Sequence, residues 1–310
     1  MGIEVQSVRL LAQAAELGVS FSKTLTIGRQ RMMVSESEAV AALKSFGHRT
    51  SDFDPAQIAG KIDPFSSKLF ELLGAQSVDA LDYSDYEGAT VIHDLNSPLP
   101  REKGARYTAV FDGGTLEHVF NLPTALASLM HLPEVGGHLI VAVPANNEMG
   151  HGFYQFSPEL FFRTLSEENG YKVEGMFLAP FFCLEPWLMV RDPARAGQRV
   201  GYAGWAMPTY VLVIARRIAE VAPFQRAPQQ TDYVLDWGAA EAANNTRREA
   251  VRPSFIRRVI QDIAPQSVLR KARHLRARWA RPDPRSMVSF APSRGGAAEI
   301  RSFYAEPETR

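Results

Sequence analysis

Three acidic residues stand at the ends of three successive predicted strands. The segments VDALDYS, ATVIHD and YTAVFDGGTLEH place Asp82, Asp94 and Asp112 at these ends. Because ligands of open α/β sheets bind outside the carboxyl ends of the strands, the three acids should point into one crevice. A carboxylate there can accept hydrogen bonds from ligand hydroxyl or amino groups. We expect this crevice to be the functional site.

Two histidines follow the predicted strands. His118 stands beside Glu117, just beyond the strand that ends at Asp112, and His151 lies in the loop GHGFYQ, with Tyr154 nearby. Since the pKa of histidine lies near neutrality, His118 is our first candidate for a general base, His151 the second and Tyr154 a neighbouring contributor. The alternative role of each is packing or capping. No pair among the acids and histidines has a recognised metal-ligand spacing, so no metal site is predicted.

Alternating strands and helices must position these residues. Strands are expected at 24–27, 78–81, 90–92, 108–111 and 138–143, with a turn at 135–137. Helices are expected from the capping box at Ser35, from Pro64, over 123–132, and from Ser157 to Gly170. Residues 172–182 and 209–215 are β-like and should pair antiparallel. The pattern predicts an α/β fold with about seven strands, mostly parallel, and helices on the faces of the sheet.

The predicted organisation is one α/β domain followed by an extension. The domain covers 1–217, with 35–63 as a lid-like insertion and 184–208 as an insertion between the last two strands. Residues 218–310 form a linker and a basic, helical C-terminal extension, with arginines concentrated between 252 and 281. Such a stretch packs on its own domain or makes peripheral contact with an anionic membrane. Nucleic-acid binding is disfavoured because no groove-reading motif accompanies the charge.

Composition agrees with a globular protein of 310 residues. Hydrophobic residues make up 45%, and 34 basic residues balance 34 acidic ones, so the overall charge gives no attraction to nucleic acid. The single Cys183 excludes an internal disulfide, and no apolar run approaches the roughly 20 residues of a membrane span. No export signal is recognised at the start, and we expect a cytoplasmic protein.

From about residue 24 to residue 216, the chain resembles the class I S-adenosylmethionine-dependent methyltransferases. The resemblance is carried by ALDYS, VIHDLNSPLP, AVFDGGTLEHVFNLPTALASLMHLPEVGGHLIVAVP and FYQFSPELFFRTLSEENGYKVEG. It implies a Rossmann-like three-layer sandwich and S-adenosylmethionine as the cofactor. By the same resemblance, Asp82 binds the cofactor ribose and Asp94 contacts adenine, with the backbone of Leu95 alongside.

The resemblance assigns further positions around the cofactor. Tyr83 lies beside adenine, with Tyr86 as the alternative, and Asp112 with Gly113 borders the reaction centre. Thr26 and Gly28 hold the cofactor at the first strand.

The first strand departs from the pattern of this family. Its turn, TIGRQRMM, offers Gly28 alone, with Arg29 and Gln30 where small residues are expected. Either residues 35–63 are an inserted lid, or this copy of the fold has lost the cofactor. The first reading predicts methyl transfer to oxygen or nitrogen of a small-molecule or glycan acceptor. The second predicts an inactive scaffold or partner-binding protein. A nicotinamide-dependent oxidoreductase is disfavoured because G-x-G-x-x-G is missing.

Overall fold

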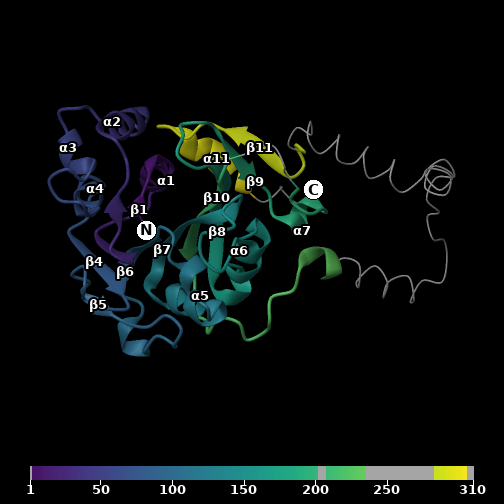
Figure 1. The fold of residues 1–310 in the computed structure, drawn as a ribbon. Helices are drawn as coiled ribbons and strands as arrows, with labels where there is room; N and C mark the ends of the chain where they lie inside the picture. The colour runs from purple at the N-terminus through teal and green to yellow at the C-terminus, as the bar shows by residue number, and fades with distance from the viewer. Residues whose placement is uncertain (1, 202–206, 235–282, 306–310) are drawn as a thin grey trace, which may run out of the picture.

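One large sheet forms the centre of the protein. The computed structural model describes residues 2–201, 207–234 and 283–305. Among these residues the sheet has nine strands in the order β11-β9-β8-β10-β7-β6-β2-β4-β5 (Figure 1). Five neighbouring strands are parallel: β5 (Val91–Ile92), β4 (Ser77–Asp82), β2 (Lys23–Ile27), β6 (Tyr107–Asp112) and β7 (Pro133–Asn146).

The other half of the sheet is antiparallel. β10 (Thr209–Arg217) lies between β7 and β8 (Tyr171–Pro180) and runs antiparallel to both. β9 (Trp187–Val190) pairs with β8, and β11 (Met287–Phe290) pairs with β9. The expected antiparallel pair is therefore confirmed, and β9 and β11 add two strands to the seven expected. By its strand order the chain is a Rossmann-like α/β protein, as predicted.

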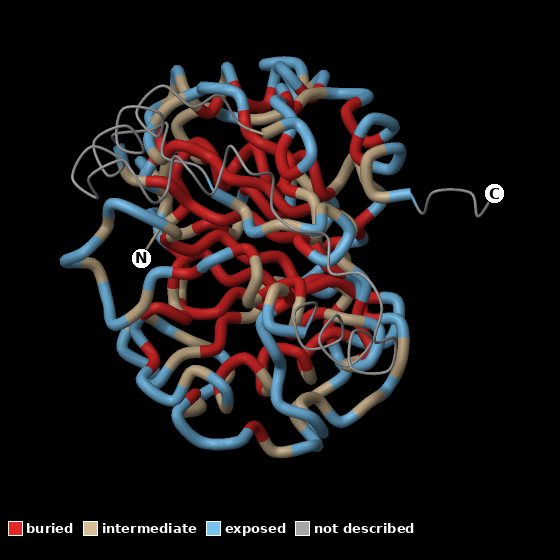
Figure 2. Tube along the Cα trace, turned by 90° about the vertical axis from the view of Figure 1, so that its right-hand side faces the viewer, coloured by how far each residue is buried: buried red, intermediate tan, exposed pale blue. Residues whose placement is uncertain are grey.

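Helices cover both faces of the sheet. Successive residues of a strand point to opposite faces, so Val110 and Phe111 of β6 belong to different core clusters. The Val110 cluster includes residues of α5 (Leu122–His131) and α6 (Pro158–Thr164). The Phe111 cluster includes residues of α1 (Val5–Glu16), α2 (Glu36–Ser45), α4 (Ser67–Leu72) and α11 (Gly296–Tyr304). Figure 2 shows the buried residues concentrated in the interior of the molecule, with exposed segments around the outside. The arrangement is a three-layer sandwich.

The N-terminal helix α1 was not expected from the sequence. Its N-cap is Glu4, whose buried carboxylate accepts hydrogen bonds from the backbone N of Gln6 at 2.8 Å and of Ser7 at 2.7 Å. The Gln6 side chain donates to the carbonyls of Pro180, at 3.0 Å, and Cys183, at 2.6 Å. The start of the chain is thereby tied to the end of β8.

The segment between β2 and β4 forms part of the helical layer. The predicted capping box of α2 is confirmed, since the Ser35 and Glu38 side chains each accept from the other's backbone N. Leu43 of α2 is fully buried in the same cluster as α1. The segment also contains the short α3 (Pro55–Ile58) and β3 (Arg31–Met32), which pairs parallel with β1 (Gly2–Ile3). Residues of the expected lid, such as Leu43 and Ile58, are therefore buried in the helical layer.

Two element starts differ from the prediction. The helix expected from Pro64 begins at Ser67, because the Pro64 carbonyl accepts from Met32 N at 2.8 Å and Ser66 N donates to the Gln30 carbonyl at 3.0 Å. These bonds hold residues 64–66 beside the first turn. β7 begins at Pro133, before the expected start at residue 138, and its register with β6 passes from Tyr107–Pro133 to Ala109–His138. Residues 134–137, where a turn was expected, therefore form an irregularity within the strand. Gly136, at φ 94°, accommodates the irregularity.

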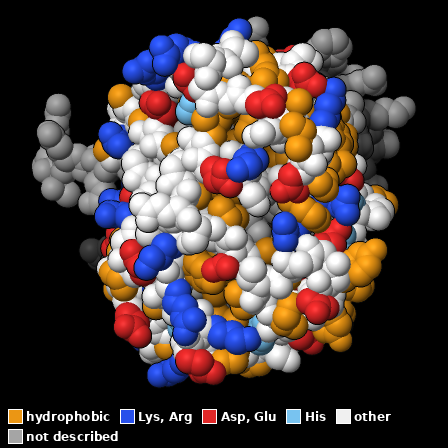
Figure 3. Space-filling view, turned by 90° about the vertical axis from the view of Figure 1, so that its left-hand side faces the viewer, with side chains coloured by type: hydrophobic (Ala, Val, Ile, Leu, Met, Phe, Trp, Pro, Cys, Tyr) orange, Lys and Arg blue, Asp and Glu red, His pale blue; other side chains and the backbone are white. Residues whose placement is uncertain are grey.

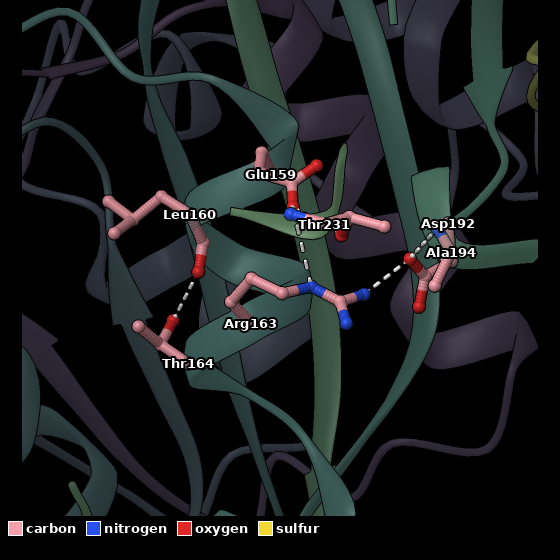
Figure 4. A network of polar contacts seen from close by, with 7 residues as sticks. All are labelled: Glu159, Leu160, Arg163, Thr164, Asp192, Ala194 and Thr231. Atoms are coloured by element: carbon pink, nitrogen blue, oxygen red, sulfur yellow. Dashed lines mark hydrogen bonds and ion pairs between the residues drawn. The ribbon is translucent and has the colours of Figure 1, made fainter. Parts of the chain in front are cut away.

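Short elements complete the connections. These are η1 (Arg101–Lys103), η2 (Leu116–His118), η3 (Glu167–Asn169) and α7 (Pro193–Ala196). The expected helix from Ser157 is divided into α6 and η3, and it ends as predicted at Gly170, at φ 75°. Figure 4 shows Arg163 of α6 between Glu159 and Asp192, while Thr231 N donates to Glu159 at 2.9 Å. This network joins α6 to the chain before α7 and to the segment after β10.

The described end of the chain returns to the sheet. β11 extends the antiparallel edge, and the Tyr304 hydroxyl of α11 lies 2.7 Å from the Met176 carbonyl and 2.9 Å from the Val190 carbonyl. Residues 283–305, assigned from sequence to the extension, thus pack with the domain that precedes residue 217. The arginine-rich stretch 252–281 lies outside the described residues.

The surface gives no dominant charge on the face that carries α3, α4 and β4. Basic and acidic side chains are both spread over that face (Figure 3). Among the helices in the described parts of the chain, none combines the length and apolarity required to cross a bilayer.

Candidate functional site

The strand order reverses between β2 and β6. From β2 the chain proceeds outward to β4 and β5, then returns to the other side of β2 to form β6 and β7. Ligands of doubly wound sheets bind at the carboxyl ends of the strands beside such a switch point. Here Ile27, the last residue of β2, pairs with Asp112, the last residue of β6. Gly28 and Gly113 therefore border the switch point.

The acid that ends β6 has a structural role in this turn. Asp112 is completely buried and accepts hydrogen bonds from Thr115 N at 2.7 Å and Leu116 N at 3.3 Å. Its burial raises the pKa of its carboxyl group. Thr115 precedes the following short helix, η2, but its side chain does not cap it. The structure gives the capping bonds to Asp112, while Thr115 Oγ1 donates to the Ile27 carbonyl at 2.9 Å.

Two glycines let the turn after β6 approach the loop after β7. Gly114 adopts φ 102°, and a Cβ there would lie 2.9 Å from Glu117 Oε1. Gly152 adopts φ 82°, and a Cβ there would lie 2.7 Å from the Glu117 carbonyl oxygen. That carbonyl accepts from Phe153 N at 2.6 Å and Tyr154 N at 3.3 Å. The loop containing His151 is therefore fixed to the backbone of Glu117.

This packing brings the two predicted histidines together. The rings of His118 and His151 have centroids 5.0 Å apart, and His151 Nε2 lies 3.6 Å from Glu117 Oε1. The side chain of Glu117 is completely buried, and neither carboxylate oxygen has a hydrogen-bond partner among the described residues. Burial, and then the neighbouring Asp112, raise the pKa of Glu117, while burial and His151 lower the pKa of His118. Sequence reasoning named Glu117 beside His118 and as one of the acids that could converge with the two histidines, but it rejected a metal site there because no recognised ligand spacing was present.

A cavity of about 210 Å³ opens beside this cluster. Its lining residues come from the start of the chain, the turn after β6, the loop after β7, the end of β8 and β10: Gly2, Ser7, Met33, Gly113, Gly114, Glu117, Ala142, Glu148, His151, Phe181, Phe182 and Tyr210. Of the predicted site residues, Gly113 and His151 line it. Sequence reasoning missed the contribution of α1, although the spacing of Val5, Val8 and Leu11 on one helical face could have revealed that helix.

Tyr154 is directed elsewhere. Its hydroxyl donates to the Phe120 carbonyl at 2.8 Å, and its ring contacts the core through Phe156. The structure thus accounts for Tyr154 as a residue that fixes the loop.

The turn after β2 contains a buried amide. Gln30 is 1% exposed, and its Nε2 donates to the Ile27 carbonyl at 2.6 Å. Its Oε1 has no partner among the described residues and points toward Gly113, where an added Cβ would lie 2.8 Å away. Gly28 adopts φ 71°, and its N donates to the Leu81 carbonyl at 2.6 Å. Thr26 is buried, and its hydroxyl lies 3.4 Å from the Asp79 carbonyl.

The remaining predicted acids lie farther along the same sheet edge. Asp82 is two strands from Asp112, about 10 Å at the usual strand spacing. Its Oδ1 accepts from Tyr83 N at 2.7 Å, and Tyr83 is 74% exposed. Asp94 accepts from the backbone and side chain of Asn96, which lowers its pKa.

Neither acid lines the 210 Å³ cavity, and the side chain of Leu95 is buried in the core. The edge thus has a buried part near Asp112 and an open part near Asp82 and Asp94.

Comparison with known proteins gives only distant likenesses. No protein-family model matches the chain, and no curated protein matches it. The chain is similar to the branched-chain polyamine synthase of Thermus thermophilus, with 15% identity, a TM-score of 0.34, and coverage of 72% of this chain and 59% of that one.

Two other similar structures are methyltransferases. One is the 1,6-didemethyltoxoflavin-N1-methyltransferase of Burkholderia thailandensis, with 12% identity, a TM-score of 0.34, and coverage of 69% of this chain and 79% of that one. The other is a phosphoethanolamine N-methyltransferase of Haemonchus contortus, with 10% identity, a TM-score of 0.34, and coverage of 85% and 55%. We take the fold from the strand order, which makes this chain a Rossmann-like α/β protein.

Proposed function

We propose that the protein transfers a methyl group from S-adenosylmethionine to oxygen or nitrogen of a small-molecule acceptor. A glycan is the other acceptor class that the sequence suggests. The observation that carries this proposal is the cavity beside Gly113 and Gly114, at the edge where the strand order reverses. Glycines there let a ligand approach the backbone, and the switch point is the usual binding place of the fold.

The open part of the edge fits a nucleoside. Asp82 Oδ2 makes no hydrogen bond with the described part of the chain, so it is available to ribose hydroxyls. Tyr83 and Tyr86 are 74% and 90% exposed and offer aromatic faces for adenine. Asp94 and the backbone of Leu95 complete this part of the proposed site.

The buried part of the edge fits the amino-acid portion of the cofactor. Gln30 Oε1 is a buried acceptor without a partner among the described residues, and such a group is costly unless something donates to it. An ammonium group is a suitable donor. Thr26 and Gly28 hold the turn that carries Gln30. When bound here, the cofactor would supply an electrophilic methyl group on a sulfonium.

The cavity fits an acceptor with an apolar body. Met33, Phe181 and Phe182 supply apolar surface, while Glu117 and His151 supply polar atoms. Holding the acceptor in line with the methyl group can provide much of the rate, because orientation alone is worth several kcal/mol. Proton removal by His118 or His151 stays a prediction.

A non-catalytic scaffold is the second candidate function. Gln30 occupies space beside Gly113 where a glycine-rich turn would leave room, and Asp94 already satisfies the turn at Asn96. These observations favour a fold that has lost its cofactor.

Calorimetric titration of the full chain with S-adenosylmethionine and with S-adenosylhomocysteine separates the two functions. We expect binding at micromolar level and a loss of about 1–3 kcal/mol on Asp82→Ala, because hydrogen bonds to a charged group disappear. Asp85→Ala, an exposed change in the same loop, is the control and should bind as the wild type does. If folded protein gives no heat of binding with S-adenosylmethionine or with S-adenosylhomocysteine, the result would favour the non-catalytic scaffold.

A further inference from the structure

Glu117, His118 and His151 form a cluster with the dimensions of a metal site. One potential ligand atom from each residue lies within 4.8 Å of the other two. Ligand atoms around a tetrahedral ion at about 2.1 Å are about 3.4 Å apart. The Glu117–His151 distance of 3.6 Å is already close to this value and is longer than a hydrogen bond. Small rotations of the imidazole rings would bring all three atoms to one ion.

The backbone holds the cluster in this arrangement. Asp112 fixes the turn that carries Glu117 and His118, through its bonds to Thr115 N and Leu116 N. The loop with His151 is joined to that turn by two backbone hydrogen bonds to the Glu117 carbonyl. The ligands would therefore come from rigid turns, as a pre-organised site requires.

The carboxylate of Glu117 is the second and independent observation. Its side chain is completely buried, and both oxygens lack a hydrogen-bond partner among the described residues. Buried carboxylates are normally paired, hydrogen-bonded or bound to metal. A cation between Glu117 and the two histidines would satisfy this carboxylate.

We infer that Glu117, His118 and His151 bind one divalent transition-metal ion of the Zn²⁺ class. Two imidazoles and one carboxylate suit zinc, cobalt, iron or manganese, whereas Mg²⁺ prefers oxygen ligands. Three protein ligands leave coordination positions for water or an acceptor oxygen. His151, which is half-exposed, and the buried Glu117 both line the cavity, so an ion bound between them is accessible from the cavity. This inference goes beyond methyl transfer and does not require the cofactor. It makes both histidines metal ligands, whereas the sequence analysis predicted no metal site.

Metal titration of the full chain tests the site directly. The protein is treated with a chelator, dialysed and titrated calorimetrically with Zn²⁺ and, separately, with Mg²⁺. Co²⁺ is added as a spectroscopic probe, because its visible absorption reports coordination by protein ligands. The variants are His118→Ala, His151→Ala and Glu117→Gln. The control is His138→Gln, which changes another histidine that lies 3.1 Å from a glutamate, Glu174, but belongs to no three-residue cluster within the described parts of the chain.

We expect one Zn²⁺ per chain, a Co²⁺ absorption spectrum, and weaker binding of Mg²⁺. Each histidine variant should lower Zn²⁺ affinity at least about tenfold, because mutation of a residue that only supports a metal ligand often costs that much. His138→Gln should leave the affinity unchanged. Failure of folded wild-type protein to bind Zn²⁺ or Co²⁺, or unchanged affinity in His151→Ala, would overturn the inference. If Glu117→Gln does not fold, the histidine variants still decide. Titration with S-adenosylmethionine tests the proposed function separately.

Discussion

The ionisation of Glu4 should control the stability of the N-terminal segment. Glu4 caps α1 and is 1% exposed. Its burial raises the pKa from 4.5 to about 7, against the opposing effect of hydrogen bonds from Gln6 N and Ser7 N. Ser7 lines the cavity, so the carboxylate supports the wall of the candidate site. The perturbation is Glu4→Gln, which removes the charge and keeps one acceptor oxygen.

The sign and size of the effect follow from the two pKa values. A carboxyl group whose pKa is raised by folding binds more protons in the folded state, so stability falls as the pH rises between about 4.5 and 7. The difference of about 2.5 pKa units corresponds to about 3 kcal/mol at 1.36 kcal/mol per unit. Above the folded pKa the loss is complete.

Urea unfolding of the wild type and Glu4→Gln between about pH 5 and pH 8 measures this difference. Other titrating groups are common to both proteins and cancel in the comparison. Near pH 5 we expect the two proteins to have similar free energies of unfolding. Near pH 8 we expect Glu4→Gln to be more stable than the wild type by about 2–3 kcal/mol. Parallel pH profiles for the two proteins would refute the raised pKa of Glu4. A wild type that gains stability with pH relative to Glu4→Gln would refute the sign.

Three further predictions concern the site and the C-terminal helix. Gln30→Met should leave the free energy of unfolding within about 1 kcal/mol of the wild type, because the unpaired acceptor disappears together with the hydrogen bond to the Ile27 carbonyl. It should weaken S-adenosylmethionine binding about tenfold in calorimetry, and unchanged affinity would exclude Gln30 from the cofactor site. Gly152→Ala should destabilise the protein and weaken Zn²⁺ binding, because the added Cβ would lie 2.7 Å from the Glu117 carbonyl oxygen. Gly136→Ala is the control: it has a similar positive φ but no atom near the added Cβ, so its cost should be limited to the about 1–2 kcal/mol of a left-handed alanine. Tyr304→Phe should lower stability by about 1–3 kcal/mol in urea unfolding, because buried hydrogen bonds are lost, whereas the exposed Tyr86→Phe should be neutral. A neutral Tyr304→Phe would show that the hydrogen bonds of this hydroxyl contribute little to stability.

Local sequence patterns predicted the parallel half of the sheet. Strand ends at Asp82 and Asp112 are observed, and Ser35 begins its helix through the predicted capping box. These features depend on neighbouring residues, so the sequence shows them directly. The antiparallel pairing of β8 with β10 was also recognisable, because the sequence between these strands shows no helical pattern of the length that a parallel crossover needs.

Features that depend on distant contacts were missed. The extension of β7 back to Pro133 depends on its pairing with Tyr107 of β6. β11 pairs with β9 across about a hundred residues, and no local pattern indicates such a partner. The proximity of His118 and His151 depends on Gly152 packing against the backbone of Glu117. The spacing of residues in the sequence does not show that contact.

The position of β10 has a consequence for synthesis on the ribosome. This strand lies in the middle of the sheet but is among the later strands to be made, so β7 and β8 cannot be joined until residue 217 has emerged. During that interval the nascent chain exposes the edge of β7 that pairs with β10 in the finished protein. Residues such as Val141 and Val143, which are fully buried in the folded chain, lie on this strand. Open apolar edges pair with other chains. Fragments that stop before residue 209 should therefore aggregate, and the unfinished chain should be a client of ribosome-associated chaperones.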